Sequence, residues 1–235
     1  GKTLLAAATA GNLDATFFNV KVSNLLSKYF GESTRLISAL FSVARRLSPA
    51  VIFLDEFESL TPPRGSGESG AERRIVSTFL AELDGLAVKK NPGFVLTIGA
   101  SNAPWLLDSA ILSRFQRRIY VPLPDEEARR SILEIHLTQR GHRTSSSLVE
   151  IARRTQGFSG REIEQLCQAA ISHMTRRLNP NLEQVVDQGY EQVGAYTLIV
   201  SEISQADLDY AFAQVRPIAN ANMLRKFETW EKSME

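Results

Sequence analysis

The first half of the chain alternates short apolar runs with longer stretches of helical periodicity. Four of these runs are rich in β-branched and aromatic residues and predict strands: Phe17–Val22, Val51–Leu54, Phe94–Ala100 and Ile119–Val121. Strands that alternate with helices predict a parallel sheet with helices on both faces. We therefore expect an α/β fold, which binds its ligands at the carboxyl edge of the sheet.

After Pro122 the pattern changes, because strand-like runs nearly disappear and helical periodicity takes over. Ser159 and Glu162 have the spacing of a capping box, which marks the start of a helix. One apolar stripe follows at steps of three and four residues: Ile163, Leu166, Cys167, Ala170 and Met174. We expect a large α/β subdomain over residues 1–122 and a small helical one over 123–235. Within the second, the segment 179–201 is hard to assign, although its residues 196–200 favour a strand.

Composition and charge exclude several classes of protein. Lys and Arg number 27 against 26 Asp and Glu, so the net charge of +1 gives no general attraction to nucleic acid or to an anionic membrane. No apolar run approaches the roughly 20 residues that span a bilayer, and the first residues do not resemble a signal peptide. We expect a cytoplasmic protein without a transmembrane segment. Its single cysteine, Cys167, falls on the apolar stripe and is expected in the core.

The first candidate chemistry is Gly1-Lys2-Thr3, followed by a helix-forming apolar stretch. These residues match the end of a phosphate-binding loop, in which backbone N–H groups and the lysine contact phosphate oxygens and the hydroxyl holds Mg²⁺. The glycines that precede this triplet in such loops are not in the sequence, so we expect the chain to begin inside the motif. A triplet alone is weak evidence, because it also arises by chance.

Asp55 and Glu56 provide the context for that triplet. They follow the buried apolar run Val51–Leu54 directly, at the predicted carboxyl edge of the sheet. In a P-loop ATPase, Asp55 would hold Mg²⁺ through water and Glu56 would polarise the water that attacks the γ-phosphate of ATP. The alternative, a solvated acidic turn after a strand, becomes a poor explanation when this pair is combined with Lys2 and Thr3.

Asn102 ends the next apolar run and adds a third polar group at the same predicted edge. An amide beside the acidic strand can orient the attacking water or contact the γ-phosphate. The alternative is an asparagine in a turn that precedes Pro104.

The chain resembles the AAA ATPase family, and within it the meiotic clade of microtubule-severing and ESCRT-disassembling enzymes. The matching motifs occur in family order from residue 1 to about residue 175: Lys28–Ser33, Ile52–Glu56, Arg64–Ser69 with Arg73 and Arg74, Leu107–Ile111, Arg114–Asp125 and Gly157–Gly160. Together they are specific for the family and only suggestive for the clade. The resemblance implies an ATPase that uses ATP and Mg²⁺, with a helical lid, and that acts on polypeptide rather than nucleic acid.

The resemblance also assigns residues that the patterns alone do not explain. Arg114, Arg117 and Arg118 match arginines that reach the ATP of a neighbouring subunit, which implies a ring, normally a homohexamer. Two segments match the loops that line the central pore: Lys28, Tyr29 and Phe30 for gripping substrate, and residues 65–72 for the second loop. His136 and Gly160 match positions that contact adenine and ribose.

Two exchanges depart from the family pattern, and two further features bear on its branches. Glu58 and Ser101 stand where relatives have Asp and Thr, exchanges that should preserve hydrolysis. The segment 179–201 is too short for the β-rich insertion of ESCRT-disassembling members, and no zinc motif of the membrane proteases is present.

Two other functions remain open on sequence alone. A nucleic-acid motor or loader on the same fold would need a basic channel, to which only Lys28 and nearby arginines contribute. A nucleotide-binding scaffold without turnover is disfavoured by the presence of Asp55, Glu56 and Asn102.

Overall fold

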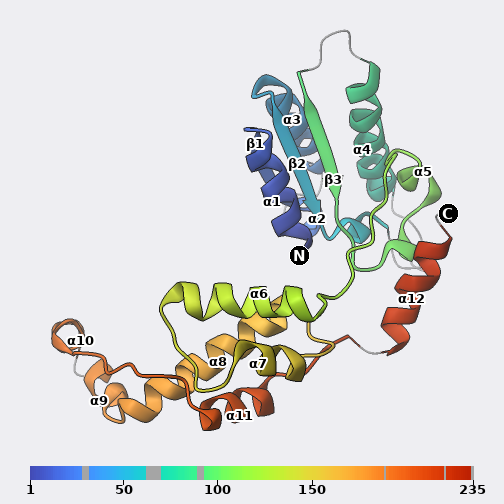
Figure 1. The fold of residues 1–235 in the computed structure, drawn as a ribbon. Coiled ribbons are helices and arrows are strands. Elements are labelled where there is room, and N and C mark those ends of the chain that lie inside the picture. Colours follow the sequence, from blue (N-terminus) through green and yellow to red (C-terminus); the bar gives the residue numbers. More distant parts are fainter. Residues whose placement is uncertain (28–31, 62–69, 89–92, 188, 220, 234–235) are drawn as a thin grey trace. The chain divides into compact units, whose positions relative to one another are not determined.

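The computed structural model describes residues 1–27, 32–61, 70–88, 93–187, 189–219 and 221–233. They form two compact units, Gly1–Val121 with the end of the chain from Trp230, and Pro122–Thr229. The elements of the first unit are α1 (Lys2–Asn12), β1 (Thr16–Lys21), α2 (Val22–Ser27), α3 (Ser33–Arg46), β2 (Ala50–Asp55), η1 (Phe57–Leu60), α4 (Gly70–Val88), β3 (Val95–Gly99), η2 (Pro104–Leu106) and α5 (Ser109–Leu112) (Figure 1).

The first unit is built on a parallel sheet with the strand order β1-β2-β3. Val51 of the central strand pairs with Phe17 on one side and with Leu96 on the other. The first five residues of β2 are fully buried, as expected for a strand with a neighbour on each edge and a helix layer on each face. This explains why β2 reads as a continuous apolar run rather than an alternating one.

Successive side chains of β2 pack on opposite faces of the sheet. Phe53 joins Ala6 of α1 and Ala100 in one cluster. Ile52 and Leu54 join a second cluster on the other face, which contains Phe41 of α3 and Phe79 of α4. The predicted parallel sheet with helices on both faces is therefore confirmed.

One predicted strand is wrong. Residues 119–121 are in neither a strand nor a helix, and the side chain of Ile119 is 79% exposed. An apolar run adopts a strand only when burial and a neighbouring strand stabilise it. Neither holds for this run within the described residues, so β propensity alone gave the wrong assignment.

The second unit is helical, as predicted. Its elements are α6 (Glu126–His136), η3 (Thr138–Arg140), α7 (Leu148–Arg154), α8 (Gly160–Leu178), α9 (Leu182–Asp187), α10 (Tyr190–Ala195) and α11 (Gln205–Gln214), and α12 (Ala221–Lys232) follows at the end of the chain. The capping box is present, because the N–H of Ser159 donates to Oε2 of Glu162 at 2.6 Å. None of the helices, over the parts of the chain described, has the length and apolar character needed to cross a membrane.

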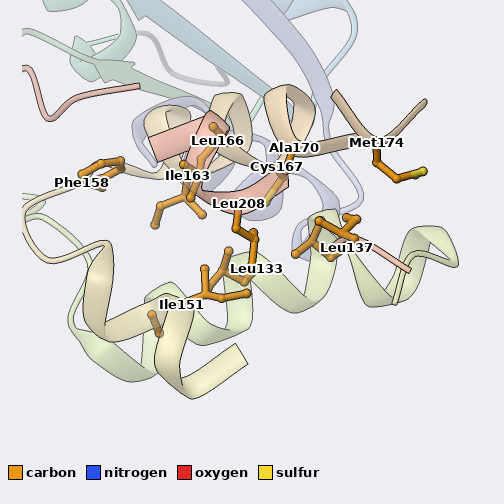
Figure 2. Close-up of a cluster of buried hydrophobic side chains, with 13 residues drawn as sticks. Leu133, Leu137, Ile151, Phe158, Ile163, Leu166, Cys167, Ala170, Met174 and Leu208 are labelled. Atoms are coloured by element: carbon orange, nitrogen blue, oxygen red, sulfur yellow. The ribbon is translucent and has the colours of Figure 1, made fainter. Parts of the chain in front are cut away.

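The predicted apolar stripe of α8 forms the centre of the second core. Its residues Ile163, Leu166, Cys167, Ala170 and Met174 are buried against side chains of α6, α7 and α11, including Leu133, Ile151 and Leu208 (Figure 2). Burial raises the pKa of the Cys167 thiol to about 12, so the thiol stays protonated and acts as an apolar core group.

The expected strand at residues 196–200 is also absent, for a specific reason. The segment takes its backbone partner from a side chain instead of another strand. The amide of Asn179 donates to the C=O of Ile199 at 2.8 Å and accepts from its N–H at 2.9 Å. Asn179 also accepts from the Tyr196 hydroxyl at 3.1 Å. A buried asparagine therefore holds this segment against the end of α8.

Candidate active site

The amino end of α1 meets the loop that follows β3. Lys2 Nζ donates to Oδ1 of Asn102 at 2.7 Å, although the two residues are 100 positions apart in the sequence. The amino end of α1 lies at the carboxyl edge of the sheet (Figure 1). Two of the predicted site residues from distant motifs are thus in direct contact.

Asp55 and Glu56 lie at the same edge, at the end of β2. Asp55 is the last residue of the strand and is in register with Lys21, the last residue of β1. Its Oδ1 accepts the N–H of Glu56 at 2.9 Å. Glu56 has a left-handed backbone, with φ 53° and ψ 46°. This conformation costs a residue with a side chain about 1–2 kcal/mol, and such strain is concentrated at functional sites.

Two residues that the sequence analysis missed hold the Glu56 carboxylate. Lys21 Nζ lies 2.8 Å from Oε1, and the hydroxyl of Ser23 donates to Oε2 at 2.9 Å. The hydrogen bond from Lys21, followed by that from Ser23, lowers the pKa of Glu56 below its ordinary value. Glu56 is therefore ionised at neutral pH, as a general base must be. A lysine ending the strand beside β2 was the signal in the sequence that could have revealed this contact.

Glu58 links the two loops at the sheet edge. Its Oε1 accepts the N–H of Asn102 at 3.3 Å, while its Oε2 is buried and has no hydrogen-bond partner among the described residues. Backbone bonds reinforce the link, because the N–H of Phe57 donates to the C=O of Ala100 at 3.0 Å. Asn102 is consequently positioned from two sides, by Lys2 and by Glu58. The glutamate that departs from the family pattern has a structural use here.

The residues at this edge fit a nucleotide phosphate and its metal ion. No side chain caps the first turn of α1, and that turn contains no acidic residue, which suits an anion at the helix terminus. Lys2 contacts the neutral amide of Asn102, and no carboxylate among the described residues pairs with it. Thr3 and Asp55 supply the hard oxygen donors that Mg²⁺ prefers when it is shared with phosphates. No cluster of three or more metal-binding side chains occurs in the described ranges.

The three candidate arginines differ in their contacts. Arg114 forms a paired contact with Asp84 at the end of α4, with both nitrogen–oxygen distances 3.1 Å, and also donates to the C=O of Ala110 at 3.2 Å. Arg118 donates to the C=O of Leu112 at 3.3 Å. Arg117 is exposed and has no partner within the described part of the chain. The structure therefore fixes Arg114 firmly, and Asp84 was not anticipated from the sequence.

His136 and Gly160 belong to the second unit. His136 is the last residue of α6, and its Nδ1 lies 4.0 Å from Oε1 of Glu164 without a hydrogen bond. Gly160 is the first residue of α8, where an added Cβ would lie 3.6 Å from the side chain of Ile132. Both residues therefore belong to the paired helices α6 and α8.

The pore-loop residues lie outside the described residues. Lys28, Tyr29 and Phe30 belong to the gap at 28–31, and most of the segment 65–72 belongs to the gap at 62–69. Their expected roles stay predictions.

A parallel sheet with a lysine, an acidic pair and an amide at one edge, joined to a helical unit, defines a nucleotide-binding α/β class with a lid. The chain matches the model of the ATPase family associated with various cellular activities (AAA) over residues 1–123 and that of the AAA+ lid domain over residues 145–187. It belongs to the AAA ATPase family, and within it the relatives place it with the meiotic clade, as the motifs predicted.

Two relatives in sequence and one solved structure illustrate its similarity to members of that family. The chain is 37% identical to spastin of Gallus gallus over 233 residues, which cover 99% of this chain and 36% of the relative. It is 34% identical to vacuolar protein sorting-associated protein 4A of Rattus norvegicus over 262 residues, covering 99% and 60%. The crystal structure of the FIGL-1 AAA domain in complex with ADP matches with a TM-score of 0.81 and 34% identity, covering 99% and 74%. The chain spans just over a third of spastin's length.

Proposed function

We propose that the intact protein hydrolyses ATP and uses the free energy to remodel, unfold or disassemble protein substrates. The substrate passes through the central pore of a ring, which we take to be a homohexamer. The observation that carries the proposal is the hydrogen bond between Lys2 and Asn102. It lies at the edge of the sheet where β2 ends in Asp55, which Glu56 follows. Similarity to spastin and to vacuolar protein sorting-associated protein 4A supports a remodelling ATPase.

Each residue of the edge has a role in this proposal. Lys2 binds the β- and γ-phosphates, and Thr3 and Asp55 hold Mg²⁺, the latter through water. When bound, Mg²⁺ neutralises part of the charge on the phosphates. Glu56 accepts a proton from the attacking water, and Asn102 orients that water. In this proposal, the hydrogen bond between Lys2 and Asn102 breaks when Lys2 binds a phosphate.

Lys21 and Ser23 position the base. They contact both carboxylate oxygens of Glu56, at 2.8 Å and 2.9 Å. The carboxylate stays ionised there, so only its orientation has to change for it to accept a proton. The contacts with Lys21 and Ser23 therefore set the ionisation state of Glu56, whereas the orientation of its carboxylate is set separately.

The remaining roles extend the proposal beyond this edge. Arg114, Arg117 and Arg118 act on the ATP of the neighbouring subunit, and the pore residues Lys28, Tyr29 and Phe30 grip the substrate chain. In the lid, taken as residues 123–235 beside an ATPase subdomain of residues 1–122, His136 and Gly160 contact the adenosine. The proposed compartment is the cytoplasm.

The class of substrate is tested by what stimulates ATP turnover. We expect an unfolded polypeptide, such as reduced and carboxymethylated lactalbumin, to raise the turnover of the intact protein severalfold. Single-stranded DNA should have no effect, because the described edge offers no extended basic channel. Stimulation by DNA but not by polypeptide would make the protein a nucleic-acid motor, and ATP binding without turnover would make it a scaffold.

Action of the arginines between subunits is tested by mixing inactive variants. Lys2→Ala should lose nucleotide binding, and Arg114→Ala, Arg117→Ala or Arg118→Ala should retain it but lose turnover. In a mixed ring, the nucleotide site of an arginine variant can face an intact arginine of a Lys2→Ala subunit. We therefore expect mixtures to recover turnover, measured as phosphate release.

A mixture that recovers no turnover would contradict action between subunits. If arginines served only the site of their own subunit, every subunit in the mixture would lack one necessary group and no recovery would follow. Comparing the three arginine variants identifies which guanidinium reaches across. A matched control is Arg130→Ala on the exposed face of α6, which should be active alone.

A further inference from the structure

The chain between α10 and α11 runs through the second unit without helix from residue 196 to residue 204 (Figure 1). Its two ends are extended, with φ −75° and ψ 125° at Tyr196 and φ −79° and ψ 166° at Ser204. In an extended chain, the N–H and C=O of one residue point to one edge and those of the next residue point to the other edge. The two edges of this segment therefore have separate sets of backbone groups.

On one edge, the backbone groups of Ile199 and Ile203 have partners inside the second unit. Ile199 exchanges two hydrogen bonds with the buried amide of Asn179, at 2.8 Å and 2.9 Å. Ile203 donates to the C=O of Arg143 at 2.9 Å and accepts from the N–H of Ser145 at 3.0 Å. Ile199 and Ile203 are four positions apart and so face the same edge. The amide of Asn179 thus acts as a substitute for a neighbouring strand.

The opposite edge contains the backbone groups of Leu198 and Val200. Neither residue has a backbone hydrogen-bond partner in the described part of the chain. The side chains of Leu198, Ile199 and Val200 are 46%, 56% and 53% exposed, which gives three consecutive apolar residues open to solvent. An apolar extended edge with free backbone groups is the usual template for pairing with another chain.

The surroundings of this edge are acidic. From residue 178 to residue 215 the sequence has no lysine or arginine, and four exposed acidic residues flank the segment: Glu183, Asp187, Glu191 and Glu202. The charge around the open edge therefore favours a basic partner.

We propose that residues 197–201 are a docking edge that binds an extended segment of a partner protein, in which apolar residues alternate with lysine or arginine. The bound segment adds as a strand, and its backbone pairs with that of Leu198 and Val200. Its apolar side chains cover the exposed apolar residues, and its cations face Glu191 and Glu202. A second copy of this chain is a poor occupant, because a two-fold edge pairing brings two acidic segments together.

The test uses a fluorescein-labelled peptide of alternating lysine and valine, titrated with the full chain without nucleotide and followed by fluorescence anisotropy. We expect saturable binding. The same peptide with alternate backbone amides methylated keeps its charge and apolar surface but loses its donors, and should bind roughly tenfold more weakly. A peptide with glutamate in place of lysine should not bind.

Variants of the protein test the same docking edge without a change to the peptide. Leu198→Pro removes one free N–H while keeping an extended φ, and should weaken binding roughly tenfold. Leu198→Ala keeps the N–H and is the matched control, with a smaller loss. Glu191→Lys combined with Glu202→Lys should weaken binding and make it less sensitive to salt. Circular dichroism and thermal unfolding confirm that each variant is folded, and Val200→Pro replaces Leu198→Pro if that one is not.

Three outcomes overturn the proposal. Equal binding of the methylated and unmethylated peptides would exclude backbone pairing, and this comparison needs no variant of the chain. Unchanged binding by both folded proline variants would place the peptide elsewhere. Concentration-dependent dimers that disappear in Leu198→Pro, without peptide binding, would make a second copy the occupant.

Discussion

Glu56→Gln is expected to leave ATP binding intact and to lower ATP turnover by a factor of roughly 100 to 10,000, the range for loss of a general base. Glutamine has the size of glutamate and keeps the contact with Ser23, but it cannot accept a proton from water. In the proposed site, nucleotide affinity is assigned to Lys2, Thr3 and Asp55, which the exchange does not touch. Binding of a fluorescent ATP analogue and phosphate release measure the two quantities separately.

The same variant provides a test of mechanism beyond turnover. A ring that binds ATP without hydrolysing it should hold an unfolded polypeptide in a stable, ATP-dependent complex. Glu134→Gln, the same exchange at an exposed position of α6, is the control and should behave as the unmodified protein. Undiminished turnover of Glu56→Gln would remove the basis for the proposed site, because no other carboxylate was assigned as the base.

Asp207→Ala is expected to lower the free energy of unfolding of the second unit by about 3 kcal/mol. The side chain of Asp207 is fully buried in α11 and contacts two side chains of α8, Arg177 with paired distances of 2.8 Å and 3.1 Å and His173 at 2.7 Å. It also accepts from the N–H of Ser204 at 2.9 Å. The expected loss is at the low end for a buried pair, because Arg177 is 42% exposed and can be rehydrated.

The loss should depend on pH in a defined direction. Burial by itself raises the pKa of Asp207, but hydrogen bonds from Arg177, Ser204 and His173 outweigh it and hold the pKa below its ordinary value. A lowered pKa stabilises the fold above the unfolded-state pKa of about 4 and loses that contribution as pH falls below it. The difference in the free energy of unfolding between the unmodified protein and Asp207→Ala should therefore be largest above about pH 5 and should become smaller as the pH falls below that value.

Asp209→Ala is the matched control for this prediction. Asp209 lies on the same helix and contacts Arg154 at 2.7 Å, but its side chain is 56% exposed. An exposed ion pair is screened by solvent and contributes little to stability, so its loss should be small. Native-state hydrogen exchange of the α8 and α11 amides measures both variants without requiring the two units to unfold together. Equal losses for the two variants would contradict the role assigned to Asp207.

Patterns with a single physical cause were predictable from the sequence. The apolar run of β2 and the stripe of α8 are each determined by burial, and both were predicted correctly. The capping box at Ser159 depends only on two residues three positions apart. Lys2, Asp55 and Asn102 were expected at one edge because parallel strands all end at the same side of a sheet.

The runs at residues 119–121 and 196–200 show where such prediction fails. Both have the composition of strands, but a strand exists only with a neighbour, and neighbours are decided by the tertiary structure. At 196–200, the neighbour is the side chain of Asn179, 20 positions before Ile199. No propensity describes that contact.

The sequence by itself determined the class of the protein: a parallel sheet with a nucleotide site at its carboxyl edge, followed by a helical unit. Only the tertiary structure decided which side chains hold the site residues in place. Lys21 and Ser23 hold Glu56, Glu58 and Lys2 hold Asn102, and Asp84 holds Arg114. The physical reason is the range of the interactions, because periodicity and capping act between near neighbours in the chain, whereas an ion pair or hydrogen bond between side chains requires the fold to bring distant residues within about 3 Å.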